Sequence, residues 1–161
     1  MKSLVLAGGC FWGVEAYFRQ FDGILHTEVG YANGKTIEPT YEEVCNASGH
    51  AEAVMLHYNS EIITTSQLIK LYLDIVDPVA VNKQGNDVGV QYRTGVYYEN
   101  LTQFNTVEKV LEAYAQEIGQ DLAIELLPLD NFYRAEEEHQ LYLDKNPNGY
   151  CHIPKEKLNL K

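Results

Sequence analysis

The stretch Gly8-Gly9-Cys10-Phe11-Trp12-Gly13 constrains this chain more than any other feature. It follows a short apolar run, 3–7, and precedes a segment, 14–21, whose apolar residues recur at helical spacing. The pattern predicts a strand, a tight glycine turn and a helix that begins at the cysteine. Two glycines let the backbone bend sharply and leave the cysteine sulfur uncovered.

Two features of a helix N-terminus favour reactivity of a cysteine at that position. Free backbone N–H groups and the positive end of the helix dipole both stabilise the thiolate and lower the pKa of Cys10. The alternative is a buried cysteine that only packs, which is the commoner fate of a single intracellular cysteine. The glycine pair and the helix start favour a nucleophile.

Size, charge and cysteine content limit the class of protein. The chain has 161 residues, which predicts a single domain, 1–161, with its own core. A formal net charge of −11 argues against a nucleic-acid-binding surface. Three cysteines without a C-x-x-C pair predict neither a disulfide framework nor a metal site. The apolar run near Met1 is too short for a signal peptide, so we expect a cytoplasmic protein without membrane association.

Periodicity predicts the remaining elements. Strands are expected at 24–31, 50–58, 91–98 and 121–127, the last at a sheet edge because Pro128 follows it. Helices are expected at 68–76, 104–118 and 135–145, with a polar connection at 35–49 and a turn-rich tail at 146–151. The predicted fold is α+β: a two-layer sandwich on a split βαβ, ferredoxin-like core with a long irregular C-terminal tail.

Glu52 lies on the bulkier face of the strand predicted at 50–58, together with Val54, Leu56 and Tyr58. If this face is buried, the carboxyl is partly desolvated, and its pKa rises toward a value useful for donating a proton. The sequence supports equally well a carboxyl that is hydrated at the strand's end or paired with a cation.

Two tyrosines and a second cysteine complete the candidate site. Tyr41 and Tyr92 lie in or beside glycine-punctuated polar loops, where a buried phenol is a neutral hydrogen-bond donor. Asp87 has the sequence context of a turn residue. Cys151 is on the tail and is suited to resolving an oxidised Cys10. This set fits a small substrate with an apolar group, an electrophilic centre and an oxygen that must leave with protons.

Six segments resemble the motifs of one enzyme family, the peptide-methionine (S)-S-oxide reductases (MsrA). In chain order they are GCFWGVE, EVGYANG, PTYEEVC, GHAEAV, QGNDVGVQYR and NPNGYC, and they span nearly the whole sequence. The resemblance implies a thiol-dependent oxidoreductase that reduces methionine-S-sulfoxide, free or in proteins, and so repairs oxidised proteins. It implies no cofactor other than thioredoxin or another dithiol as reductant.

The resemblance also implies a role for each candidate residue. Cys10 attacks the sulfoxide sulfur while Glu52 protonates its oxygen, and Cys151 then forms a disulfide with Cys10 that thioredoxin reduces. The substrate-binding residues implied by the family are Phe11, Trp12, Tyr41, Asp87 and Tyr92.

Three further points are expectations from the sequence alone. Cys45 is interpreted as a non-catalytic thiol and Glu136-Glu137-Glu138 as a solvated helix face. His139 has two interpretations, a residue that supports the site from behind and a histidine on a helix surface, and the second is favoured. The protein is expected to be monomeric. Two alternatives stay open at this stage: a non-catalytic module that grips a methionine-like side chain with Trp12 and the tyrosines, and a lipoprotein acylated at Cys10.

Overall fold

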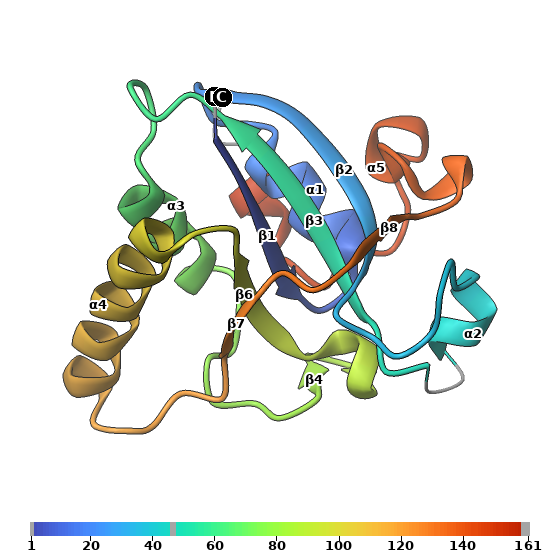
Figure 1. The fold of residues 1–161 in the computed structure, drawn as a ribbon. Coiled ribbons are helices and arrows are strands. Elements are labelled where there is room, and N and C mark those ends of the chain that lie inside the picture. The colour runs from blue at the N-terminus through green and yellow to red at the C-terminus, as the bar shows by residue number, and fades with distance from the viewer. Residues whose placement is uncertain (1, 46–47, 159–161) are drawn as a thin grey trace.

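A mostly antiparallel sheet forms the centre of the molecule (Figure 1). The computed structural model describes residues 2–45 and 48–158. In spatial order the strands are β7 (Glu125–Pro128), β6 (Thr94–Tyr98), β1 (Lys2–Gly8), β3 (Ala51–Tyr58), β2 (Ile24–Ala32) and β8 (Phe132–Arg134). Strands β6 and β7 are parallel, and the other neighbouring pairs are antiparallel. The edge position predicted for 121–127 is confirmed, because β7 ends the sheet.

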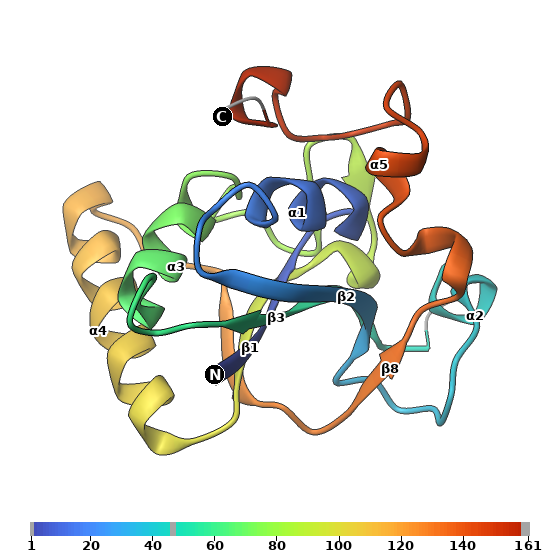
Figure 2. The same cartoon turned by 90° about the horizontal axis from the view of Figure 1, so that it is seen from above.

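Three helices, α1 (Phe11–Phe18), α3 (Thr65–Leu73) and α4 (Leu101–Ile118), pack on one face of this sheet (Figure 2). The alternation along β1 and β3 turns one row of large apolar side chains toward them, as the sequence predicts. The fully buried members of this core include Leu4, Leu6, Val54, Leu56, Phe18, Leu68 and Val107. The mixed architecture with a mostly antiparallel sheet agrees with the predicted α+β class.

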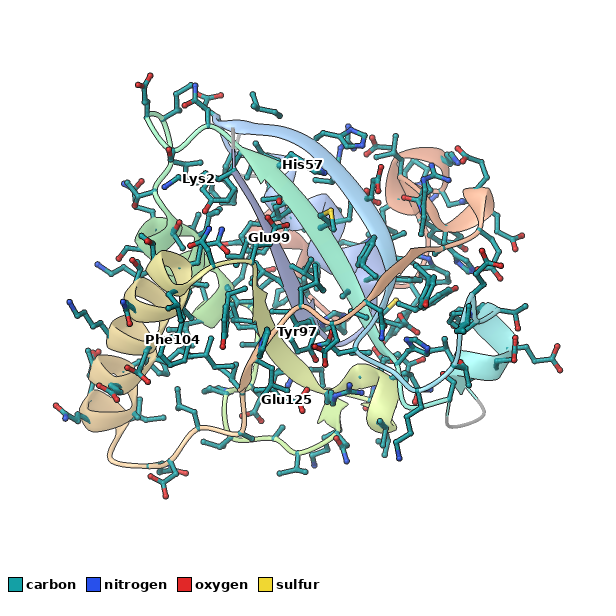
Figure 3. All side chains as sticks on the ribbon, viewed as in Figure 1. Lys2, His57, Tyr97, Glu99, Phe104 and Glu125 are labelled. Atoms are coloured by element: carbon teal, nitrogen blue, oxygen red, sulfur yellow. The ribbon has the colours of Figure 1, made fainter. Side chains whose placement is uncertain are left out.

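The opposite face is covered by the chain between β7 and β8. Small residues such as Ala7 and Ala53 face it, and Leu129 and Phe132 pack over them. At the β6–β7 edge, Tyr97 Oη donates to Glu125 Oε1 at 2.8 Å, and the two side chains point toward one another in Figure 3. Arg93 Nε donates to the same oxygen at 2.7 Å, which anchors the segment that carries Tyr92.

Local signals explain where the two long helices begin and end. Thr64 and Gln67 form a capping box at the start of α3, and the Asn100 side chain accepts a hydrogen bond from Gln103 N at the start of α4. Gly119 closes α4 in the left-handed conformation, φ 69°. Helix α3 ends at Leu73 rather than at 76, although Ile75 and Val76 remain at least nine-tenths buried beyond its end.

The polar connections contain more regular structure than predicted. Helix α2 (Tyr41–Cys45) lies within the connection 35–49, of which residues 46 and 47 are outside the described part. A hairpin of β4 (Lys83–Gln84) and β5 (Asp87–Val88) precedes a 3-10 turn, Val90–Tyr92. The strand predicted at 91–98 therefore begins only at Thr94.

The helix predicted at 135–145 is wrong. The segment consists of a 3-10 turn (Glu137–His139) and a short helix, α5 (Tyr142–Lys145), separated by Leu141 at φ 53°. Gln140 explains the break, because its buried amide accepts from Val29 N at 3.0 Å and donates to Val29 O at 2.9 Å. This tertiary pairing with β2 outweighs the helical propensity of the segment. The described chain then ends in a 3-10 turn, Lys155–Leu158.

In the ranges 2–45 and 48–158, no helix has both the length and the apolar character needed to cross a membrane.

Candidate active site

Cys10 stands between β1 and α1, at the N-cap position of the helix. The turn before it requires Gly9, whose φ is +87° and whose missing side chain leaves room for Gln84 and His152; an added Cβ would lie 2.8 Å from Gln84 Cβ. The predicted strand–turn–helix arrangement is confirmed. The expectation that the sulfur is uncovered is wrong, because Cys10 is only 6% exposed.

Glu52 lies on β3 with 1% of its surface exposed. Its Oε1 accepts a hydrogen bond from Phe11 N at 3.3 Å, next to Cys10, whereas its buried Oε2 has no hydrogen-bond partner among the described residues. Burial raises the pKa of Glu52 to about 8. The desolvated alternative is therefore correct, and the carboxyl is protonated at neutral pH with one oxygen free to donate.

The thiol of Cys10 does not have the lowered pKa that its position predicts. Burial raises this pKa well above its ordinary value, and the negative charge of ionised Glu52 raises it further. A hydrogen bond from the Trp12 backbone lowers the pKa but does not compensate. At neutral pH both Cys10 and Glu52 therefore carry their protons.

The two predicted phenols and Asp87 belong to the same electrostatic environment. Tyr41 and Tyr92 are partly buried, and burial together with the charge of Glu52 raises the pKa of both, so each phenol is a neutral donor. Asp87 on β5 raises the pKa of Cys10, Glu52 and Tyr92. Asp87 follows the tight turn at Gly85 but belongs to a strand, so the turn-only interpretation is incomplete.

Aromatic side chains form one wall beside Cys10. The Trp12 ring stacks on Tyr142 with centroids 3.7 Å apart, and its Nε1 donates to His139 Nδ1 at 3.1 Å. Phe11 packs on Tyr31 at 5.8 Å and on His139 at 5.6 Å. His139 is 8% exposed, so its assignment to a helix surface is wrong. Burial lowers the pKa of His139, and the neutral ring accepts from Trp12.

The tail is folded across the start of α1. Cys151 is partly buried, and a Cβ added to Gly13 would lie 2.8 Å from its Sγ. The neighbours of Cys151 fix the tail on both sides: Tyr150 Oη donates to Asp87 Oδ2 at 3.1 Å, and His152 Nε2 lies 3.0 Å from Gly8 O. Cys10, Cys45 and Cys151 are all free thiols.

Comparison with known proteins shows to which family this chain belongs. Residues 2–161 match the family described as peptide methionine sulfoxide reductase. The chain belongs to this family. Its similarity to the peptide methionine sulfoxide reductase MsrA of Clostridium acetobutylicum is 52% identity over 159 residues, which is 98% of each chain.

Solved structures of methionine sulfoxide reductases share the fold. Mxr1 from Saccharomyces cerevisiae in reduced form matches with a TM-score of 0.90 and 38% identity, over 95% of this chain and 91% of the yeast chain. Mxr1 in complex with Trx2 matches with a TM-score of 0.63 and 28% identity, over 86% of this chain and 83% of that chain.

Sequence reasoning missed Tyr31 and Tyr142, which surround the candidate site of this methionine sulfoxide reductase, and for His139 it favoured a helix surface over the supporting position that the structure shows. Tyr31 is the β-sheet partner of Glu52, so correct pairing of the strands 24–31 and 50–58 would have found it. Tyr142 had no usable signal, and the inward position of His139 was not favoured, because both were assigned to a continuous helix. Among the described residues, no cluster of three or more His, Cys, Asp or Glu side chains could hold a metal ion.

Proposed function

We propose that this protein reduces methionine-S-sulfoxide, free or in proteins, to methionine, with thioredoxin as the reductant. The observation that carries the proposal is the pair of protonated groups at the start of α1: the Cys10 thiol and the Glu52 carboxyl with an unpaired Oε2. A sulfoxide needs a nucleophile at sulfur and a proton at oxygen, and these groups supply both. The preference for the S epimer rests on the family alone.

The first half-reaction transfers the sulfoxide oxygen to Cys10. Glu52 donates its proton to that oxygen while the Cys10 sulfur attacks the sulfoxide sulfur, and the thiol proton restores the carboxyl. The attack forms a bond between the two sulfurs. The protonated oxygen then passes as a hydroxyl group from the substrate sulfur to the Cys10 sulfur, the sulfur–sulfur bond breaks with its electron pair on the substrate sulfur, and methionine leaves while Cys10 remains as a sulfenic acid. Tyr41 and Tyr92 hold the oxygen as neutral donors. Catalytic roles for Cys10, Glu52 and Cys151 are part of this proposal.

Phe11 and Trp12 are proposed as the apolar wall that receives the methyl group of the substrate. Their support is the packing described above, in which Tyr142 and His139 fix the orientation of the Trp12 ring. A fixed wall reduces the entropy that substrate binding would otherwise lose. Asp87 is proposed to assist binding, since it lies within the electrostatic range of Cys10, Glu52 and Tyr92.

The second half-reaction returns the enzyme to its dithiol form. The Cys151 thiol attacks the sulfenic sulfur of Cys10, and water leaves as the disulfide forms. Two thiols of thioredoxin then reduce this disulfide and become oxidised in exchange. The yeast relative in complex with Trx2 supports this choice of reductant. No prosthetic cofactor enters the proposed cycle.

The proposed cycle is tested by supplying each sulfoxide epimer to the wild type, Cys10→Ser and Cys151→Ser with thioredoxin. The wild type should turn over the S epimer, and Cys10→Ser should release no methionine. Cys151→Ser should release about one methionine per enzyme and then stop, because the first half-reaction needs only Cys10. Residual turnover by Cys10→Ser would contradict the nucleophile, and normal cycling by Cys151→Ser would contradict the resolving thiol.

Several broader assignments are also part of the proposal. We propose one domain spanning 1–161, a monomer, and a role in protein repair under oxidative stress. The strand order β6-β1-β3-β2 supports the finer description as a split βαβ, ferredoxin-like core, with an irregular C-terminal tail after α5. We also propose a cytoplasmic compartment, because three cysteines do not form the even and dense disulfide framework of secreted proteins.

A further inference from the structure

The three glutamates of the acidic run, 136–138, are all exposed, but Glu136 differs from its neighbours in its hydrogen bonds. Glu136 Oε1 accepts from Tyr31 Oη at 2.7 Å, and Glu136 Oε2 accepts from Tyr41 N at 3.0 Å. Glu137, by contrast, forms an exposed ion pair with Arg134 at 2.9 Å. The segment after β8 lies beside α2 (Figures 1 and 2), and Tyr41 N at the start of α2 donates to Glu136.

Both partners of Glu136 belong to the surroundings of Glu52. Tyr31 is fully buried, is paired with Glu52 between β2 and β3, and packs on Phe11. Tyr41 is one of the two phenols proposed to hold the sulfoxide oxygen, and the charge of Glu52 contributes to its raised pKa. One carboxylate therefore connects the aromatic wall to the helix that carries a substrate-binding phenol.

The chemistry of the contact suits a carboxylate. A carboxylate has two acceptor oxygens and no donor, and here each oxygen receives one hydrogen. Burial acts to raise the pKa of Glu136, but the hydrogen bonds from Tyr31 and from Tyr41 N outweigh it, so the pKa lies below its ordinary value. The group is therefore ionised at neutral pH, and its hydrogen bonds are the stronger, charge-assisted kind.

Helix α2 needs an external contact to fix its orientation. Its own cap is internal, since Thr40 N donates to Glu43 Oε1 and Glu43 N donates to Thr40 Oγ1. These bonds shape the turn without attaching it to the sheet. The attachment comes from Glu136 at Tyr41 N, from the Tyr41 ring on His139 at 4.6 Å, and from buried Val44.

We propose that Glu136 is a positioning residue that holds Tyr41 in place for the sulfoxide oxygen. This inference rests on the proposed function, in which Tyr41 contacts that oxygen. Glu136 itself does not touch the substrate; it acts through the backbone N–H of Tyr41 and through the Tyr31 hydroxyl.

The test compares Glu136→Ala, Glu136→Gln and the matched control Glu137→Ala in single-turnover reduction of methionine sulfoxide. Glu136→Ala should lower the rate constant of methionine release at saturating substrate about ten-fold, a fraction of the loss that follows removal of a whole donor. Glu136→Gln should recover most of the rate, because the amide oxygen can accept from Tyr41 N while its NH₂ group donates to the Tyr31 oxygen. Glu137→Ala should match the wild type, since its ion pair is exposed.

A double-mutant cycle separates positioning from general destabilisation. In a Tyr41→Phe background, Glu136→Ala should lower the rate constant of methionine release by less than a further two-fold, because the phenol that Glu136 positions is already absent. The amplitude of the methionine burst should stay near one per enzyme, which shows that the variants are folded. A full ten-fold effect in the Tyr41→Phe background, or no effect of Glu136→Ala in the wild type, would overturn the proposal. An inactive wild type would instead contradict the proposed function.

Discussion

At the scale of single residues, burial decides the protonation of Cys10. A charge at a helix terminus gains about 0.3–1 kcal/mol, which corresponds to less than one pKa unit, whereas burial shifts pKa values by up to 3–5 units. Cys10 is at the start of α1, yet it is also buried beside Glu52, and burial is the larger effect. The resting enzyme therefore holds a thiol, and activation must come with the substrate.

Glu52 gives this scheme a measurable pH dependence. Because the pKa of Glu52 is about 8, the carboxyl is a proton donor below that pH and loses this role above it. The rate of methionine release in a single turnover should fall as the pH rises through about 8. In Glu52→Gln the rate should be about 100-fold lower at pH 7 and should not fall at pH 8. Stopped-flow or quenched-flow measurement between pH 6 and 10 checks both statements.

The same measurement can also contradict the role of Glu52 as the proton donor. If Glu52→Gln retains a fall near pH 8, another group donates the proton. Asp87→Asn is an informative companion, because the charge of Asp87 contributes to the raised pKa of Glu52. This variant should move the fall to lower pH without abolishing it.

At the scale of elements, the sequence predicted what depends on local pattern. The strand–glycine–helix unit around Cys10 and the core-facing row of β3 follow from periodicity, and both are present. Glu52 is buried because it shares that row with Val54 and Leu56. The alternation of side chains was therefore enough to identify the candidate carboxyl. The protonation state of Cys10, by contrast, could be predicted only from its three-dimensional environment.

What the sequence could not predict depends on contacts between distant segments. Residues 135–145 have helical composition, but Gln140 pairs with Val29 and Leu141 N donates to Glu15 Oε1 at 2.8 Å. These contacts join positions more than 100 residues apart, and no local pattern reports them. They turn His139 inward, which is why it contacts Trp12 instead of solvent.

Gly13 offers a test of how α1 and the tail fit together. A Cβ at this position would lie 2.8 Å from Cys151 Sγ and 3.2 Å from Ile153 Cδ1, so Gly13→Ala should displace the tail. Formation of the Cys10–Cys151 disulfide should slow about ten-fold. The single-turnover release of methionine should change much less, since it does not need Cys151. Rapid quenching with a thiol-blocking reagent, followed by mass spectrometry, separates the two steps.

Ala16 on the same helix provides the matched comparison. Ala16 lines a pocket together with Cys151, so Ala16→Ser adds one atom into open space instead of against the sulfur, and its disulfide should form at the wild-type rate. Equal rates of disulfide formation in Gly13→Ala and the wild type would show that the tail does not need this close approach.

At the scale of the whole molecule, the buried carboxyl of the candidate site lowers the free energy of unfolding. A folded protein that buries an ionisable carboxyl loses stability once the solvent favours its ionised form. Burial raises the pKa of both Glu15 and Glu52, but Glu15 accepts hydrogen bonds from Thr27 Oγ1 at 2.8 Å and from Leu141 N. Glu52 has one bond, from Phe11 N, and an unpaired oxygen. The less satisfied of the two carboxyls is the one proposed to donate a proton.

Glu52→Gln should therefore stabilise the fold in a defined pH range. The folded-state pKa of about 8 lies above the ordinary value of 4.5, so the protonated carboxyl is fully stabilising below pH 4.5, and this contribution is lost as the pH rises toward 8. Glutamine keeps an oxygen for Phe11 N and cannot ionise. At pH 8 the variant should exceed the wild type by about 4 kcal/mol in free energy of unfolding, and the difference should shrink toward pH 4.5. Urea denaturation at several pH values measures this, with exposed Glu61→Gln as the control. A difference that does not vary with pH would mean that Glu52 is already ionised in the folded protein at neutral pH, which would remove the proton donor from the proposed mechanism.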